Sequence, residues 1–235
     1  MLAFILTTTC RAEVELILNN THYSFPTNPR LVDALNPIAL QEQWYWPQSK
    51  LFKTNTNRSQ VLRGQIIKML RIESASNNTR KSSYQNLINQ INAWKVADRV
   101  NINIDFELAR ISLSDNPRFE DGQYRMILSK RPTQLHVFGA VNSAVDLPYP
   151  NNTCLKDILS NVSLADIADN SHVYLISPQG KAEKFPSAYW NSELCTMPMP
   201  GSSIYVPLQE SLFSKVPSTI NTQIAELAVN RINDQ

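Results

Sequence analysis

Glycine and histidine are scarce in this chain. Only 5 Gly stand against 14 Pro, and no Gly-x-y period is present. The composition therefore excludes a collagen-like repeat and argues against nucleotide enzymes built on a glycine-rich phosphate loop. The 3 His are isolated, without a His-x-Glu or His-x-x-x-His pair. Since metal sites need several ligands at defined spacing, we expect no cofactor and no metal.

The chain as a whole also lacks a large excess of positive or negative charge. Its 22 Lys+Arg and 20 Asp+Glu give a net charge of +2. Proteins that hold nucleic acid over their whole surface need many clustered cations, so we predict no nucleic-acid partner. Hydrophobic residues make up 43% of the 235 residues. That content is enough to bury one core or two small ones.

A long hydrophobic run is missing as well. The longest, Met1–Leu6, is far shorter than the roughly 20 residues that span a bilayer, so we predict no transmembrane segment. Small and polar residues follow it up to Ala12, as at the end of a secretory signal. We interpret residues 1–12 as a truncated export signal and predict a periplasmic mature chain. The alternative is a hydrophobic N-terminus that packs against the fold.

Cysteine is rare, with Cys10, Cys154 and Cys195 in the whole chain. Removal of the leader would leave the even pair Cys154 and Cys195, which suits an oxidising compartment. One interpretation is a disulfide between these two residues. The other is a pair of buried free thiols.

Alternating apolar residues predict strands in the first part of the chain. One strand begins at Glu13, and a second covers His22–Phe25 after the turn residues Asn19–Thr21. A short helix is expected over Arg30–Leu35. Further strands are predicted over Val100–Ile104, Ala109–Leu113 and Tyr124–Leu128.

Between these strands, the apolar period changes to that of a helix. One stripe runs from Val61 to Leu70 and another from Tyr84 to Trp94, with polar Ser76–Thr79 between them, which predicts a helical hairpin. Residues 50–97 hold nine Lys or Arg against one acid, Glu73. Such a run is usually a solvated helix face. The alternative is a contact with an anionic polysaccharide, a lipid headgroup or an acidic partner.

A second series of elements follows Lys130–Pro132. Its members are a strand over Leu135–Val141, a helix over Leu155–Leu159, and strands over Val173–Ser177 and Ser203–Val206. The two series have similar order, which suggests a tandem of small α+β domains. The chain ends in an amphipathic helix from Val216 onward. We expect this helix to pack on its own domain, and docking to a membrane or a partner is the alternative.

Catalytic motifs are not found at their usual spacing. Ser202 and Ser203 lack the Gly-x-Ser-x-Gly context of a nucleophilic serine. Asp105 and Glu107 lie two residues apart, close to a predicted strand, and such neighbours rarely reach both sides of a sugar. We therefore predict that the protein is not an enzyme.

Several short motifs in a fixed order carry a resemblance to a known family. They are Trp44–Pro47 before the hairpin, Ala97–Val100 after it, Lys130–Pro132 followed by Leu135–Val141, Leu147–Tyr149, and Pro200–Ser202 before the last strand. Together they resemble the GfcC family of capsule-operon periplasmic proteins, which includes YjbG-like members. The likeness covers nearly the whole mature chain. The order and spacing of the motifs carry it, because each motif alone is short.

The resemblance implies an α+β fold of tandem β-grasp (ubiquitin-like) domains. A helical hairpin is inserted in the first domain, and an amphipathic helix ends the chain, an arrangement similar to soluble parts of the Wza-type outer-membrane polysaccharide exporters. The expected boundaries are residues 13–130 for the first domain, with the hairpin at residues 50–97. The second domain is expected over residues 131–210 and the C-terminal helix over residues 213–235.

The resemblance also implies a function and a site. It implies a non-catalytic accessory protein for capsule or exopolysaccharide assembly or export, which binds the polysaccharide or an outer-membrane export protein. By order and spacing, a pocket arginine of the family falls on Arg99. Asp98 stands where the family usually has glycine, so an Arg99–Asp98 ion pair is the other interpretation. The alternative functions are a polysaccharide-modifying enzyme and an envelope interaction module that does not contact sugar.

Overall fold

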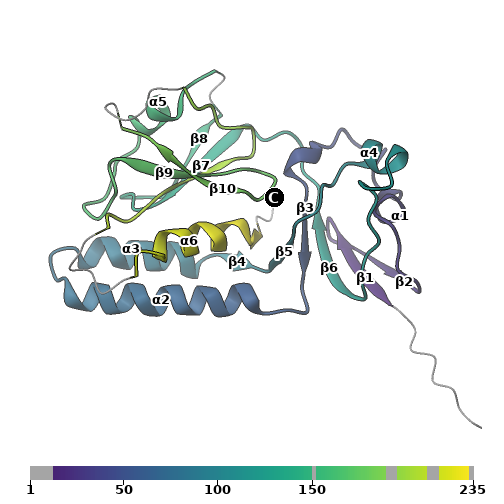
Figure 1. The fold of residues 1–235 in the computed structure, drawn as a ribbon, viewed down its shortest axis with the longest axis horizontal. Coiled ribbons are helices and arrows are strands. Elements are labelled where there is room, and N and C mark those ends of the chain that lie inside the picture. Colours follow the sequence, from purple (N-terminus) through teal and green to yellow (C-terminus); the bar gives the residue numbers. More distant parts are fainter. Residues whose placement is uncertain (1–12, 150–151, 189–194, 211–216, 233–235) are drawn as a thin grey trace, which may run out of the picture.

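The structure, a computed structural model, describes residues 13–149, 152–188, 195–210 and 217–232. The predicted export signal at residues 1–12 lies outside these ranges. The fold is α+β, as predicted: two five-stranded sheets lie beside each other, and a long helical hairpin runs along the second sheet (Figure 1).

The first sheet is built from the N-terminal half of the chain. Its strands are β1 (Val14–Leu18), β2 (Thr21–Phe25), β3 (Lys50–Lys53), β5 (Asp98–Val100) and β6 (Gly122–Ile127). They lie in the order β2-β1-β6-β3-β5, with β1 parallel to β6 and the other neighbours antiparallel. The alternation in β1 buries Val14, Leu16 and Leu18. These side chains share a core with those of α1 (Leu31–Leu35).

The strand predicted over Ala109–Leu113 is wrong. This segment belongs to α4 (Phe106–Ile111), whose N-terminal cap is Asp105. The Asp105 carboxylate accepts hydrogen bonds from the backbone N–H of Glu107 and Leu108 at 3.0 and 3.1 Å. Such a cap favours a helix, and Phe106 and Ala109 become buried one turn apart. Asp105 therefore has a structural role as the N-terminal cap of α4.

The second sheet repeats the connectivity of the first. Its strands are β7 (Gln134–Gly139), β8 (Val145–Pro148), β9 (His172–Ile176), β10 (Ala182–Pro186) and β11 (Ser203–Val206). Counted in chain order within each sheet, both sheets have the strand order 2-1-5-3-4, with a parallel pair at the centre. A short helix follows the first hairpin in each, α1 in one and α5 (Leu155–Leu159) in the other.

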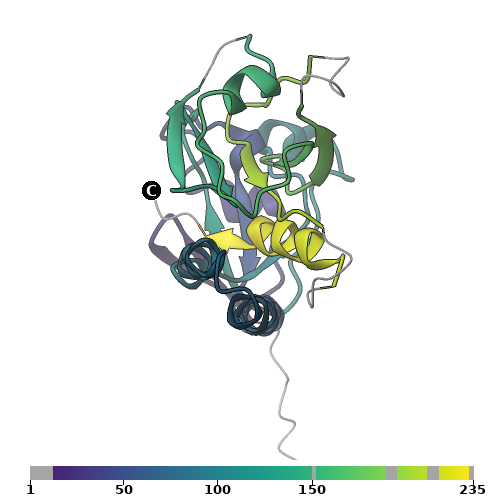
Figure 2. The same cartoon turned by 90° about the vertical axis from the view of Figure 1, so that its left-hand side faces the viewer.

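The helical hairpin is shorter than predicted. It consists of α2 (Arg58–Ser76) and α3 (Lys81–Asn92), because Lys50–Lys53 forms β3 and Lys95–Val96 forms the short strand β4. The hairpin leaves the first sheet after β3 and returns to it at β5. Its apolar side, however, packs in one core with the second sheet (Figures 1 and 2). The hairpin is inserted between two strands of the first sheet and is buried against the second, so it connects the two halves of the molecule.

Polar side chains of α3 fix this packing at the end of β7. Gln90 accepts a hydrogen bond from the N–H of Gly139 at 3.0 Å and donates one to its carbonyl at 3.1 Å. Gly139 has φ 106°, and a Cβ there would lie 2.3 Å from the Val206 carbonyl oxygen. Only glycine fits this backbone position. The hairpin thus binds where β7 and β11 come closest.

The chain end closes the same core. Helix α6 (Ile220–Val229) buries Ile220, Ile224 and Leu227, and the following strand β12 (Arg231–Ile232) pairs with β4. The prediction that this helix packs on the protein is confirmed. Within the described part of the expected range 213–235, the helix covers Ile220–Val229, and residues 213–216 and 233–235 lie outside the described residues. Within the described residues, none of the helices has the length and apolarity needed to cross a membrane.

Buried Asn221 anchors α6 to the second sheet. Its side chain is 3% exposed, accepts hydrogen bonds from the Tyr205 hydroxyl and the Leu208 N–H, and donates one to the Leu208 carbonyl, all at 2.8–2.9 Å. Three buried polar groups thus depend on one amide. Buried polar groups that lose their partners are costly, so this residue is a sensitive point of the fold.

We expect Asn221→Ala to lower the free energy of unfolding by about 3 kcal/mol, because it leaves several buried groups without partners. Chemical denaturation measures this change. The matched control is Asn89→Ala on the exposed side of α3, with an expected change within about 0.5 kcal/mol. Equal stability of the two variants would contradict the anchoring role.

Cys154 and Cys195 are joined by a disulfide in the structure. Their Cα atoms are 5.1 Å apart, and 41 positions separate them in sequence. Beside them, the Leu155 N–H donates a hydrogen bond to the Thr196 carbonyl at 2.8 Å. The bridge therefore links the start of α5 to the segment that precedes β11.

Replacement of both cysteines by alanine is expected to lower the free energy of unfolding by about 4 kcal/mol, because the unfolded chain loses a loop constraint. Alkylation of the purified protein without reductant, followed by mass spectrometry, should leave both residues unmodified. The same protein treated with reductant should be alkylated at both Cys154 and Cys195. Two alkylated thiols in the unreduced sample would show that the bridge does not form.

Candidate functional site

Arg99 lies on β5, at the edge of the first sheet, where this sheet meets the second half of the molecule. Its Nη2 donates a hydrogen bond to the Pro178 carbonyl at 2.6 Å, and its backbone N–H donates one to Asn230 Oδ1 at 2.8 Å. Gly180, with φ +90°, lies so close that a Cβ there would be 3.0 Å from the guanidinium carbon. One arginine thus contacts both the β9–β10 turn and the end of α6.

Arg99 also lines a pocket of about 230 Å³. The pocket lies between the start of α2, strand β5, the β9–β10 turn and the end of α6. Its wall includes Arg58, Ser59, Gln179, Glu226 and Asn230. Arg58 and Glu226 form an exposed ion pair across it, with 3.8 Å between Nη2 and Oε1. The pocket therefore combines half-buried Arg99 and exposed Arg58 with two carboxylates, Asp98 and Glu226, and with amide and hydroxyl groups.

Asp98 and Arg99 serve different partners. The Asp98 carboxylate accepts hydrogen bonds from the N–H groups of Ser59 at 2.7 Å and Arg58 at 3.2 Å, and one from the Ser59 hydroxyl. Burial raises the pKa of Asp98, but these hydrogen bonds outweigh it and the pKa lies below its usual value. Asp98 thus satisfies the first N–H groups of α2, a task that Asn57 at the cap position leaves undone.

Lys50 on β3 lies close enough to Arg99 on β5 and Arg231 on β12 to feel both charges, and the three residues together are termed the cationic junction. Burial, together with the charges of Arg99 and Arg231, lowers the pKa of Lys50 to about 8. Burial alone lowers the pKa of Arg99 to about 10. Among the described residues, no carboxylate lies within ion-pair distance of Lys50 or Arg99. Burial lowers the pKa of Arg231 as well, and there the Asp146 charge acts in the opposite direction. At Lys50 and Arg99 the positive charge is therefore desolvated without a carboxylate partner among the described residues.

Arg231 connects the cationic junction to His136. Its Nη1 lies 2.9 Å from His136 Nε2, and its guanidinium carbon lies 5.5 Å from the centre of the Trp94 ring. His136 Nδ1 is 2.6 Å from Asp146 Oδ1. Burial lowers the pKa of His136, and the Arg231 charge adds to this, against the hydrogen bond with Asp146. A neutral ring with its proton on Nδ1 satisfies both neighbours, so Nε2 is occupied as an acceptor.

Sequence reasoning singled out Arg99 through the family resemblance and missed Lys50 and Arg231. Lys50 is one of nine cations in its segment, and Arg231 follows the C-terminal helix without a motif. Their proximity arises from sheet pairing and from the β4–β12 contact, both long-range. Within the described ranges, no group of three His, Cys, Asp or Glu side chains is arranged to hold a metal ion.

Comparison with known proteins covers most of the chain. The family model "Capsule biosynthesis GfcC, N-terminal" matches residues 11–131, and the model "Capsule biosynthesis GfcC C-terminal" matches residues 143–233. The protein named "Uncharacterized protein YjbG" of Escherichia coli (strain K12) is 29% identical over 204 residues, which covers 86% of this chain and 82% of that protein. The gap between the two family models, residues 132–142, contains β7, the first strand of the second sheet.

The buried charge of Lys50 predicts a specific pH dependence. In the unfolded chain Lys50 keeps its proton up to about pH 10.5, whereas in the folded protein it releases the proton near pH 8. Between these values the unfolded state binds more protons, so the free energy of unfolding rises with pH, by up to about 3 kcal/mol. Below pH 8 both states are protonated, and the folded protein carries the full cost.

We therefore expect Lys50→Met to be more stable than the wild type at pH 7 and to lack this rise between pH 8 and pH 10.5. Urea denaturation at several pH values measures both. Lys184→Met, on the exposed side of β10, is the matched control and should keep the wild-type profile. Parallel pH profiles for wild type and Lys50→Met would show that Lys50 is not desolvated.

Proposed function

The chain belongs to the capsule biosynthesis GfcC family, and from this premise we propose that it is a non-catalytic periplasmic accessory protein for capsule or exopolysaccharide assembly or export. The family supports a role in capsule assembly. The apolar start of the chain and the Cys154–Cys195 pair support an oxidising compartment such as the periplasm.

Each of the two sheets is proposed to form a β-grasp domain. The support is their common strand order 2-1-5-3-4, the central parallel pair and the short helix after the first hairpin. Two domains of one fold that meet at an edge provide a rigid body with a junction between them. Recognition sites are often located at such junctions.

The cationic junction is the observation that carries the proposal. A ligand carboxylate near Arg99 would restore charge balance to Lys50 and Arg99 without the cost of moving cations from water, because the fold has already desolvated them. The planar guanidinium of Arg99 suits bidentate recognition of a carboxylate. We propose that the ligand is an acidic group of the polysaccharide. An acidic group of an outer-membrane export protein is the second candidate.

The geometry around His136 supports a role without catalysis. An Asp–His pair is the arrangement of a general base, and Asp146 with His136 has this form. However, the nitrogen that would take a proton from substrate faces Arg231 at 2.9 Å. A base that already accepts a hydrogen bond from a cation is poorly suited to abstract protons. Incubation with purified polysaccharide and analysis of its size tests this point, and turnover would reject it.

Arg99→Ala is expected to reduce polysaccharide display on cells by at least several-fold, because a charge-assisted hydrogen bond contributes about 1.5–3 kcal/mol, or roughly 10- to 100-fold in affinity. Arg99→Lys should not restore display, since lysine lacks the bidentate fork. Display is measured by staining of surface polysaccharide in cells that produce each variant at equal level.

Arg99 also donates a hydrogen bond to Pro178, so the folding of each variant is checked by thermal unfolding of the purified protein. Arg110→Ala is the control, because Arg110 lies exposed on α4 and pairs with Glu107. Wild-type display with a stably folded Arg99→Ala protein would reject the role of this residue.

A further inference from the structure

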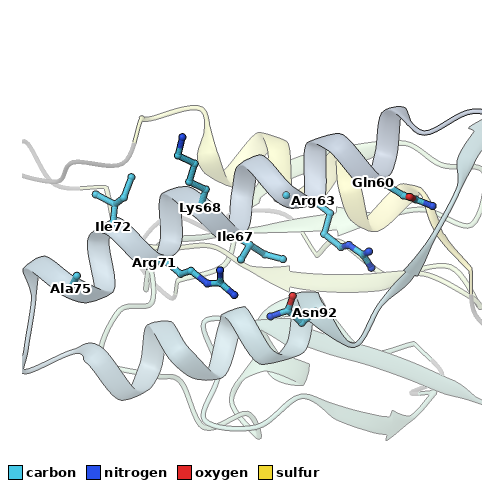
Figure 3. A pocket seen from close by; sticks show the side chains of 9 residues that line it. Gln60, Arg63, Ile67, Lys68, Arg71, Ile72, Ala75 and Asn92 are labelled. Carbon is cyan, nitrogen blue, oxygen red and sulfur yellow. The ribbon is translucent and has the colours of Figure 1, made fainter.

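The helical hairpin carries a second hollow, away from the cationic junction. It has a volume of about 610 Å³ and lies on the exposed side of α2, with Asn92 of α3 at one edge. Figure 3 shows Arg63 and Arg71 on the side of α2 that faces α3, and Lys68 on the opposite side. We call this hollow, with Arg63, Lys68 and Arg71, the basic groove.

The charges of the basic groove lack compensation. Helices α2 and α3 carry five Lys or Arg and one acid, Glu73, which is only 7% exposed. Arg63 donates a hydrogen bond to the Trp94 carbonyl at 2.6 Å, which orients it toward α3. In the part of the chain that the structure describes, no carboxylate lies within ion-pair distance of Lys68 or Arg71. The potential at this surface is therefore positive along its whole length.

The spacing of the cations suits an extended ligand. Arg63 and Arg71 are eight residues apart on the side of α2 that faces α3, which separates them by about 12 Å along the helix axis at ~1.5 Å per residue, and Lys68 lies between them in sequence on the other side of the helix. Gly64 lies between the first two, and a Cβ at this position would meet nothing within 4 Å. The groove is thus open at its floor beside Arg63.

The walls of the groove favour a polar ligand over an apolar one. Among the residues that line the groove, Ile72 is the one large apolar side chain that is well exposed, with an exposed fraction of 46%. Ile67 is only 8% exposed. An amphipathic helix needs several apolar anchors along its length, and a helix that lies on a membrane needs a broad apolar face. Gln60 and Asn92 instead provide amides that can bond to hydroxyl groups.

We propose that the basic groove binds a segment of linear acidic polysaccharide, with carboxylates at Arg63, Lys68 and Arg71 and hydroxyls at the amides. This inference rests on the proposed function, because it takes the same class of ligand. It adds a second, extended contact with the acidic polymer, on the hairpin and away from Arg99.

The test uses polygalacturonate as an acidic polymer and dextran as a neutral one. Binding to the full-length protein is measured by calorimetry at low and at 0.5 M salt. Lys68→Gln/Arg71→Gln should weaken polygalacturonate binding at least tenfold, and wild-type binding should fall with salt because exposed charges are screened. Lys81→Gln/Lys184→Gln, which removes equal charge outside the groove, should bind within twofold of wild type.

Two variants of Gly64 separate shape from charge. Gly64→Ala keeps the groove open and should bind as wild type, whereas Gly64→Gln occupies the floor and should weaken binding several-fold. Both replace a helix-interior glycine, so neither should lower the thermal midpoint. Weak binding by Gly64→Gln with an unchanged midpoint supports a ligand in the groove.

Three results would overturn the proposal. One is that Lys68→Gln/Arg71→Gln and Lys81→Gln/Lys184→Gln weaken polygalacturonate binding equally, which would mean that the polymer responds only to the overall charge of the protein. The second is dextran binding as strong as that of polygalacturonate. The third is tighter, groove-dependent binding to polyglutamate or to anionic vesicles. Arg99→Ala should retain groove binding in this assay, so failure of the proposed function at Arg99 and failure of the basic groove are distinguishable.

Discussion

The packing of the helical hairpin on the second sheet is the constraint on which the rest of the structure depends. The hairpin connects β3 to β5 of the first sheet and packs on the second sheet. The end of β3 and the start of β5 are therefore held against the second half of the molecule. The β4–β12 pair and the Asn230 contacts add the chain end to the same region. This arrangement brings Lys50, Arg99 and Arg231 together from distant parts of the sequence.

The arrangement has an electrostatic cost. A Lys50 pKa of about 8 instead of 10.5 corresponds to about 3 kcal/mol against the charged form, a large part of the stability of an ordinary domain. Methionine at this position would fill similar space without that cost. Perturbed ionisable groups gather at functional sites more often than elsewhere, and an anionic ligand would remove the cost on binding. The cationic junction and the basic groove lie at different places in the molecule, one beside the pocket of Arg99 and one along α2.

The local sequence pattern predicts much of the fold. The predictions fail where a helix cap competes with strand alternation or where a contact is distant in sequence. Alternation in Val14–Leu18 and the helix over Leu155–Leu159 follow directly from sequence. The Asp105 cap, which converts the expected strand Ala109–Leu113 into a helix, was a readable signal. The sheet on which the hairpin packs could not be predicted from local pattern, because it depends on contacts with Gly139 and the second sheet, which are distant in sequence. For the same reason, Arg99 was found through family resemblance and its neighbours Lys50 and Arg231 were not.

The central claim is that the cationic junction binds an anionic group, and the pKa of Lys50 reports on it directly. Lysine Nζ can be followed by NMR with ¹⁵N-labelled protein during a pH titration, with and without saturating oligogalacturonate. The account predicts a pKa near 8 in the free protein and a shift toward 10.5 with the oligosaccharide, because a nearby carboxylate favours the charged amine. An unchanged Lys50 pKa in the presence of bound oligosaccharide would contradict the account.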